Sequence, residues 1–129
     1  MTSIHFITQG SALSTSDTEY MQGLLSQAQF TMSITLEEAD VVVINCPGNS
    51  LEDGLSSHLD RLKKEYPYKI VVVAGCSAQT AKDLVKEYGQ EYALVGARQI
   101  HRIVEVVEEA LNDNRIKALD LGEMPPLNL

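Results

Sequence analysis

The chain has 129 residues, the length of one ordinary domain, and 44% of them are hydrophobic. This composition is typical of a folded globular protein and excludes an intrinsically disordered one. Its 10 Lys and Arg against 18 Asp and Glu give a formal net charge of −8. The acidic balance argues against a domain that grips a phosphate backbone by itself, because affinity for nucleic acid comes largely from Lys and Arg.

The sequence also argues against a membrane or secreted protein. No apolar run reaches the roughly 20 residues of a membrane helix. The first residues show no basic region followed by a long apolar core, so we expect no signal peptide. Two cysteines do not make the disulfide framework of a small secreted protein. We therefore expect a cytoplasmic protein in a reducing compartment.

The first half of the chain predicts a strand, a helix and a further strand. Residues 3–8 combine apolar and β-favouring side chains, which is typical of a short strand. Ser16-x-x-Glu19 is a capping box, which predicts that a helix begins there and runs to about residue 28. Residues 31–35 favour a weak edge strand. The continuous β-branched run at residues 41–44 indicates a strand that is covered on both faces.

The second half repeats this alternation. Ser50 can cap a helix that stops before Pro67, and residues 69–74 form a second fully apolar strand. A helix follows the Gly75-Cys76-Ser77 segment and ends at Gly89. Residues 92–95 predict a short strand, and residues 98–111 predict the clearest amphipathic helix. The side chains expected to face inward on the three helices are Leu51, Leu55, His58, Leu59 and Leu62, then Ala81, Leu84, Val85 and Tyr88, then Ile100, Ile103, Val104, Val107 and Leu111.

Alternating strands and helices predict an α/β fold, with a three-layer open parallel sheet of about five strands. The expected arrangement is flavodoxin-like or Rossmann-like. We expect one domain over residues 1–112, followed by an extended linker at 113–129. Within that linker, residues 116–121 favour a final strand or an extended arm, and Pro125-Pro126 favours extended chain. A linker at this place suggests that further chain follows.

In such folds the functional site lies beyond the carboxyl ends of the strands, which selects the loops at residues 9–15, 45–49 and 75–77. Both cysteines, Cys46 and Cys76, fall in these loops. Cys76 directly precedes a predicted helix, whose dipole favours the thiolate that binds metals or attacks electrophiles. The alternative is that both cysteines are small, partly buried residues that close strand ends.

Other familiar sites find little support. His5, His58 and His101 make no His-x-x-x-His pair, so a common zinc site is not expected. A Walker phosphate loop and a GxGxxG fingerprint are both absent. Asp17 and Asp40 do not provide the acidic pocket of a receiver-type phosphoacceptor. The acidic residues of the last helix are most simply a solvated face; they are Glu105, Glu108 and Glu109.

Three segments, at residues 8–21, 39–46 and 72–76, resemble the N-terminal domain of the radical S-adenosylmethionine methylthiotransferases. In that family Gly-Cys is followed by Asp-x-Glu, then Ala-Asp leads into a strand and Asn-x-Cys, and a further strand ends in Gly-Cys. Residues 95–109 are most similar to the archaeal and eukaryotic branch. That branch modifies N6-threonylcarbamoyladenosine beside the anticodon of tRNA.

The resemblance implies an auxiliary 4Fe–4S cluster held by three cysteines, with S-adenosylmethionine bound in a separate radical domain. On this chain it implies Cys46 and Cys76 as metal ligands and Ser11 at the third position. It also implies tRNA as a partner of the full-length enzyme and no catalysis by this domain alone. Ser11 departs from the family, because a serine oxygen is a hard donor and a poor substitute for thiolate.

The second motif, Asn45-Cys46-Pro47, is also one residue tighter than Asn-x-Cys. Either one residue is deleted, or Pro47 occupies the ligand position. Two alternatives remain beside the methylthiotransferase hypothesis. One is a cluster-free interaction or scaffold domain. The other is a small flavodoxin-like protein that uses Cys76 as a thiol, or that binds flavin through the loop at residues 9–15.

Overall fold

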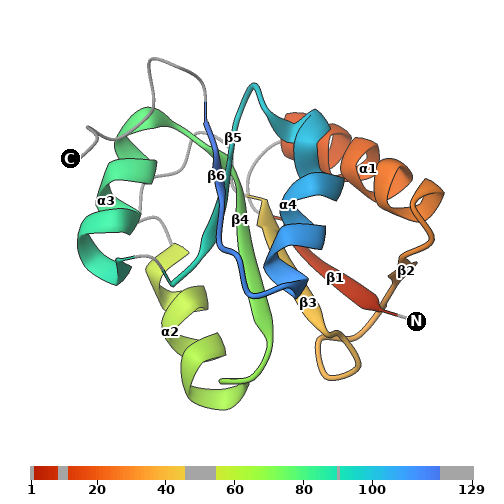
Figure 1. Cartoon of the computed structure of the whole chain (residues 1–129), viewed down its shortest axis with the longest axis horizontal. Coiled ribbons are helices and arrows are strands. Elements are labelled where there is room, and N and C mark those ends of the chain that lie inside the picture. Colours follow the sequence, from red (N-terminus) through yellow and green to blue (C-terminus); the bar gives the residue numbers. More distant parts are fainter. Residues whose placement is uncertain (1, 9–11, 46–54, 90, 120–129) are drawn as a thin grey trace.

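A computed structural model describes residues 2–8, 12–45, 55–89 and 91–119. Their six strands form one parallel sheet in the order β2-β1-β3-β4-β5-β6, with helices on both faces (Figure 1). The strands are β1 (Ser3–Thr8), β2 (Thr31–Met32), β3 (Val41–Asn45), β4 (Ile70–Cys76), β5 (Ala93–Gly96) and β6 (Lys117–Ala118). The helices are α1 (Ala12–Gln27), α2 (Ser56–Glu65), α3 (Ala78–Tyr88), the 3-10 turn η2 (Ile100–Arg102) and α4 (Ile103–Leu111). The predicted three-layer α/β fold is confirmed.

Side chains of the sheet alternate between two hydrophobic cores. Val41, Val43 and Val72 face α1 and α4, whereas Val42 and Val73 face α2 and α3. Figure 1 shows these two pairs of helices on opposite sides of the sheet. Every residue of β3 is buried, as its continuous apolar sequence predicts. The two edge strands, β2 and β6, have two residues each, so the predicted edge strand at residues 31–35 is shorter than expected.

Helix α1 begins earlier than predicted. It starts at Ala12, whereas the capping box predicted a start at Ser16. Ser16 and Glu19 are both exposed within the helix, so this motif caps nothing. The helix extends through Ser14 and Thr15, whose preference for helix is only modestly below that of the best formers. Local capping signals therefore misplace this boundary by one turn.

Helices α2 and α3 largely follow their predicted patterns. Ser50 and Leu51 lie outside the described residues, but Leu55, Leu59 and Leu62 are buried as expected. In α3 the predicted inward residues Ala81 and Leu84 are buried, and Val85 and Tyr88 are partly buried. Gly89 ends α3 with φ +65°, and its N–H donates to Val85 O at 2.8 Å. His58 is half-buried on α2.

The inward face of α4 differs from the prediction at its end. Leu111 is 38% exposed, whereas Val106 and Ala110 are fully buried. With 3.6 residues per turn, Val106 and Ala110 lie on the same face as Ile103, and Leu111 is rotated away from it. The predicted start is also refined, because residues 100–102 form the 3-10 turn η2 before α4.

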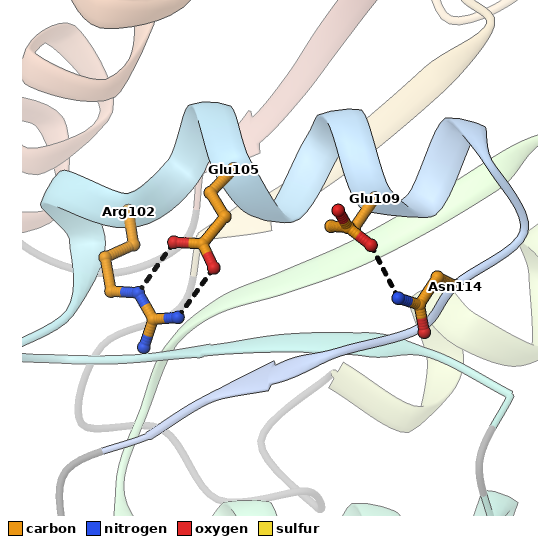
Figure 2. Close-up of polar contacts among 4 residues, drawn as sticks. All are labelled: Arg102, Glu105, Glu109 and Asn114. Carbon is orange, nitrogen blue, oxygen red and sulfur yellow. Dashed lines mark hydrogen bonds and ion pairs between the residues drawn. The ribbon is translucent and has the colours of Figure 1, made fainter.

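Local polar contacts fix both ends of α4 (Figure 2). The Arg102 guanidinium donates to both carboxylate oxygens of Glu105, at 3.0 and 2.8 Å, and this hydrogen bonding lowers the pKa of Glu105. At the other end Asn114 donates to Glu109 at 2.5 Å. Glu105 and Glu108 are exposed as predicted, but Glu109 is half-buried. Glu105 lies in the first turn, where the helix dipole favours a carboxylate. Glu109 lies near the opposite end, where its hydrogen bond from Asn114 ties the helix to the chain that leaves it.

Residues 117–118 of the segment predicted to be a linker pair with β5 as the last strand, β6. Residues 120–129 lie outside the described residues. None of the described helices has the length and apolar character needed to cross a bilayer.

Candidate functional site

The carboxyl ends of β1, β3 and β4 meet at one edge of the sheet. Thr8 pairs in register with Asn45, and Asn45 pairs with Ala74, two residues before Cys76. Parallel sheets place their sites at this edge. The sequence-predicted residues Ser11 and Cys46 lie outside the described residues, so the structure places only Cys76 of the three.

A chain of hydrogen bonds, buried at Asn45 and Thr18 and reaching the surface at Thr8, joins α1 to two strand ends at this edge. Asn45 Nδ2 donates to Thr18 Oγ1 at 2.9 Å, and the hydroxyls of Thr18 and Thr8 lie 2.8 Å apart. Asn45 is fully buried and Thr18 nearly so. Sequence reasoning did not single out Thr8 or Thr18. One sequence signal could have indicated Thr18: it lies three positions before Met21, on the helix face that is predicted to be buried. A polar residue on such a face needs a hydrogen-bond partner inside the protein.

Cys76 is enclosed rather than presented to solvent. Its side chain is 1% exposed and packs in the core beneath α2 and α3. The thiol donates to Val73 O at 3.6 Å. The helix that was expected to activate it begins at Ala78, and Ser77 caps its N-terminus by accepting from Thr80 N at 3.2 Å. This burial favours the structural interpretation of Cys76 over that of a solvent-accessible nucleophile.

Gly75 determines which face of the sheet receives Cys76. Strand alternation alone would put residue 76 on the α1 and α4 side with Ala74. Gly75 instead adopts φ +79°, and the pairing of β4 with β5 shifts register between Ala74 and Cys76. Such a bulge adds a residue and reverses the alternation. Cys76 therefore joins Val73 in the α2 and α3 core.

We predict that Gly75→Ala destabilises the chain by about 1–2 kcal/mol, because an L side chain is strained at positive φ. Urea unfolding followed by circular dichroism measures this. Gly23→Ala is the matched control: Gly23 lies inside α1 with open space where a Cβ would stand, so this variant should gain about 1 kcal/mol. Equal effects of the two substitutions would contradict the role assigned to the Gly75 backbone.

The donor set does not fit a cluster held by three thiolates. The chain has two cysteines, and the position of the third implied ligand is Ser11. Within the described ranges, no three His, Cys, Asp or Glu side chains gather into a possible metal site. His5 Nδ1 lies 3.0 Å from Ser33 O, and His101 is exposed on η2. Iron–sulfur clusters normally need three or four thiolate ligands, which this chain alone does not supply.

Comparison with known proteins supplies the family. A family model described as uncharacterized protein family UPF0004 matches residues 3–96. The ribosomal protein uS12 methylthiotransferase RimO of Natranaerobius thermophilus is 31% identical over 123 residues, covering 91% of this chain and 28% of the relative. The tRNA-2-methylthio-N(6)-dimethylallyladenosine synthase of Thermotoga petrophila is 35% identical over 113 residues, covering 84% of this chain and 25% of the relative.

A second synthase of that name, from Staphylococcus saprophyticus, is 32% identical and covers 80% of this chain. The chain spans about a quarter of the length of these relatives. Their names specify ribosomal protein uS12 and dimethylallyladenosine, so the threonylcarbamoyladenosine branch stays a prediction. Because the family model covers well over half of the chain, the chain belongs to the UPF0004 family, the N-terminal domain of the methylthiotransferases.

Proposed function

We propose that this chain serves as the N-terminal domain of a methylthiotransferase that has a radical S-adenosylmethionine domain in the same polypeptide. The observation that carries the proposal is the family match over residues 3–96, which spans the sheet from β1 to the end of β5. Asn45 and Cys76, from the two motifs of the resemblance, both stand at the carboxyl edge of that sheet. The chain that follows β6 would lead toward that domain.

The proposed reaction of the full-length enzyme is the addition of a methylthio group to a tRNA adenosine next to the anticodon. The segment at residues 95–109 favours N6-threonylcarbamoyladenosine as the target. The names of the relatives supply two competing targets, dimethylallyladenosine in tRNA and ribosomal protein uS12. The described contacts of Arg102, Glu105 and Glu109 are internal to α4 and its flanks, so they support no choice among the three.

Deletion of the gene in its native host tests the proposal. Mass spectrometry of tRNA nucleosides should show the loss of one methylthio-adenosine, and peptide mass spectrometry of uS12 serves as the competing readout. The full-length gene should restore the modification, and this 129-residue chain alone should not. Unchanged methylthio groups in both tRNA and uS12 would refute the proposal. If the methylthio group is lost from dimethylallyladenosine or from uS12 instead, the chain still belongs to a methylthiotransferase, but the substrate differs from the proposed one.

A cluster-free scaffold domain is the second candidate. Ser11 and the enclosed Cys76 favour it, because both reduce the thiolates available to iron. It keeps the family membership and removes the auxiliary cluster. The iron content of the purified chain, with and without a restored third cysteine, discriminates the two candidates. The third interpretation, a thiol- or flavin-dependent enzyme, gains no support from a Cys76 that is 1% exposed.

A further inference from the structure

A small pocket of about 170 Å³ lies at the amino-terminal end of the sheet, opposite to the candidate site. It is enclosed by the end of α2, the turn before β4, and the segments that precede β5 and β6. Val71 in its wall is five residues from Cys76 along β4, which at ~3.3 Å per residue is about 17 Å. The pocket is therefore separate from the edge that carries Cys76.

The pocket is basic in an acidic protein. Lys63, Lys69 and Arg115 line it, and Glu91 is the one carboxylate among its described lining residues, which leaves a formal charge of +2. The whole chain has only 10 Lys and Arg and a net charge of −8. The three cations come from three separate segments, so the fold, rather than one basic run of sequence, brings them together.

Part of this positive charge stabilises the fold. Helices α2 and α4 both end nearby, and cations are favourable at the C-terminal end of a helix. Arg115 Nη1 donates to Ala110 O at 2.9 Å and lies 3.4 Å from Asp113. Lys69 Nζ donates to Ala39 O and to Glu37 O. Since arginine has five N–H donors and lysine three, these contacts leave donors on both side chains.

Lys63 is held loosely. Its only ion pair within the described part of the chain is with Glu91, at 3.4 Å, and its side chain is 61% exposed. Such an exposed pair contributes little to stability, because solvent screens it and its side chains keep their freedom. An incoming anion can therefore take the place of the Glu91 carboxylate beside Lys63 at small cost.

The size of the pocket limits the ligand. Ordinary small-molecule sites measure roughly 300–1,000 Å³, so this one suits a single charged group rather than a whole cofactor. Three of its lining side chains, Leu62, Val71 and Tyr92, are buried, whereas most of its accessible lining is polar, as suits a charged ligand. A phosphate group, with its several acceptor oxygens, matches a site whose donors come from guanidinium and ammonium groups.

We propose that this pocket binds a phosphate group, held by Arg115, Lys63 and Lys69. The phosphate is either that of a small molecule or one of an RNA backbone. The proposal is independent of the methylthiotransferase function, since it uses none of the residues at the carboxyl edge.

Amide chemical shifts of the isotope-labelled chain test it. Sodium phosphate, compared with sodium chloride at equal ionic strength, should shift the amides of residues 62–71, 91–92 and 115. A short single-stranded RNA is titrated in parallel. Binding of free phosphate alone indicates a small ligand, and RNA binding at the same amides indicates a backbone phosphate. No shift at these amides with either probe would overturn the proposal.

Variants that are expected to change phosphate affinity in opposite directions provide a second test. Lys63→Gln and Arg115→Gln should each weaken binding about tenfold, and together about a hundredfold, since each removes a charged hydrogen bond. Glu91→Gln should strengthen binding, because it removes the competing carboxylate. Lys82→Gln, an exposed charge change on α3, should leave affinity unchanged. Lys63→Gln alone covers the case in which the Arg115 variant fails to fold. Equal affinity across all of these variants would reject the pocket as the binding site.

Discussion

Replacement of Ser11 by cysteine is expected to let this chain hold an iron–sulfur cluster that the chain with Ser11 should not retain. The resemblance assigns Ser11 to the third ligand position and Cys46 and Cys76 to the other two. Soft thiolates select iron–sulfur clusters, and a serine hydroxyl does not replace them. After anaerobic reconstitution with iron and sulfide, Ser11→Cys should show the iron–sulfur charge-transfer band and matching iron and sulfide contents. The chain with Ser11 should lose its iron on desalting.

Two controls make this result interpretable. Ser11→Ala should behave like the chain with Ser11, and Cys76→Ala in the Ser11→Cys background should abolish the band. Cys76 must exchange its hydrogen bond to Val73 O for a bond to iron, so the cluster has to compete with a buried contact. Ser11→Cys that stays iron-free would show that the site is lost beyond one ligand. The scaffold function would then be the better one.

Thr18→Val is expected to lower the free energy of unfolding by about 1–3 kcal/mol, because it removes a hydrogen-bond partner from a buried polar side chain. The substitution keeps the shape of the side chain and removes the hydroxyl. Asn45 Nδ2 then loses this acceptor in a fully buried position, and the Thr8 hydroxyl loses its partner as well. Chemical unfolding measured by circular dichroism gives the free energy directly.

Thr15→Val is the matched control, because Thr15 lies in the same helix and is exposed. Its effect should stay within about 0.5 kcal/mol, as for other surface substitutions. Similar losses for the two variants would mean that valine disturbs α1 itself. In that case the hydrogen bonds from Thr8 through Thr18 to Asn45 would contribute little to the free energy of unfolding.

The order of strands and helices is predictable from this sequence because it rests on long-range patterns. The apolar runs at residues 41–44 and 70–74 are short and rich in β-branched side chains, which favours strands covered on both faces. The start of α1 is not predictable in the same way. A capping box is a local signal of about 0.5–2 kcal/mol, and here the helix continues one turn before it, to Ala12.

The environment of Cys76 was beyond sequence reasoning for a different reason. Its burial depends on one backbone conformation, that of Gly75, which reverses the alternation of β4 at its last residue. Glycine adopts positive φ freely, but it does so at only some of the positions where it occurs. The sequence thus locates Cys76 at the correct edge and leaves its face undetermined.

The direction of β6 has a consequence for how a larger enzyme would be assembled. Because β6 runs parallel to β5, the described chain reaches Leu119 at the edge where Asn45 and Cys76 stand. A domain that follows in the same polypeptide would be tethered beside that edge from its first residue. A short tether raises the effective local concentration of its partner to the millimolar range. Encounter between this domain and the radical S-adenosylmethionine domain proposed to share its polypeptide would then need no strong interface of its own.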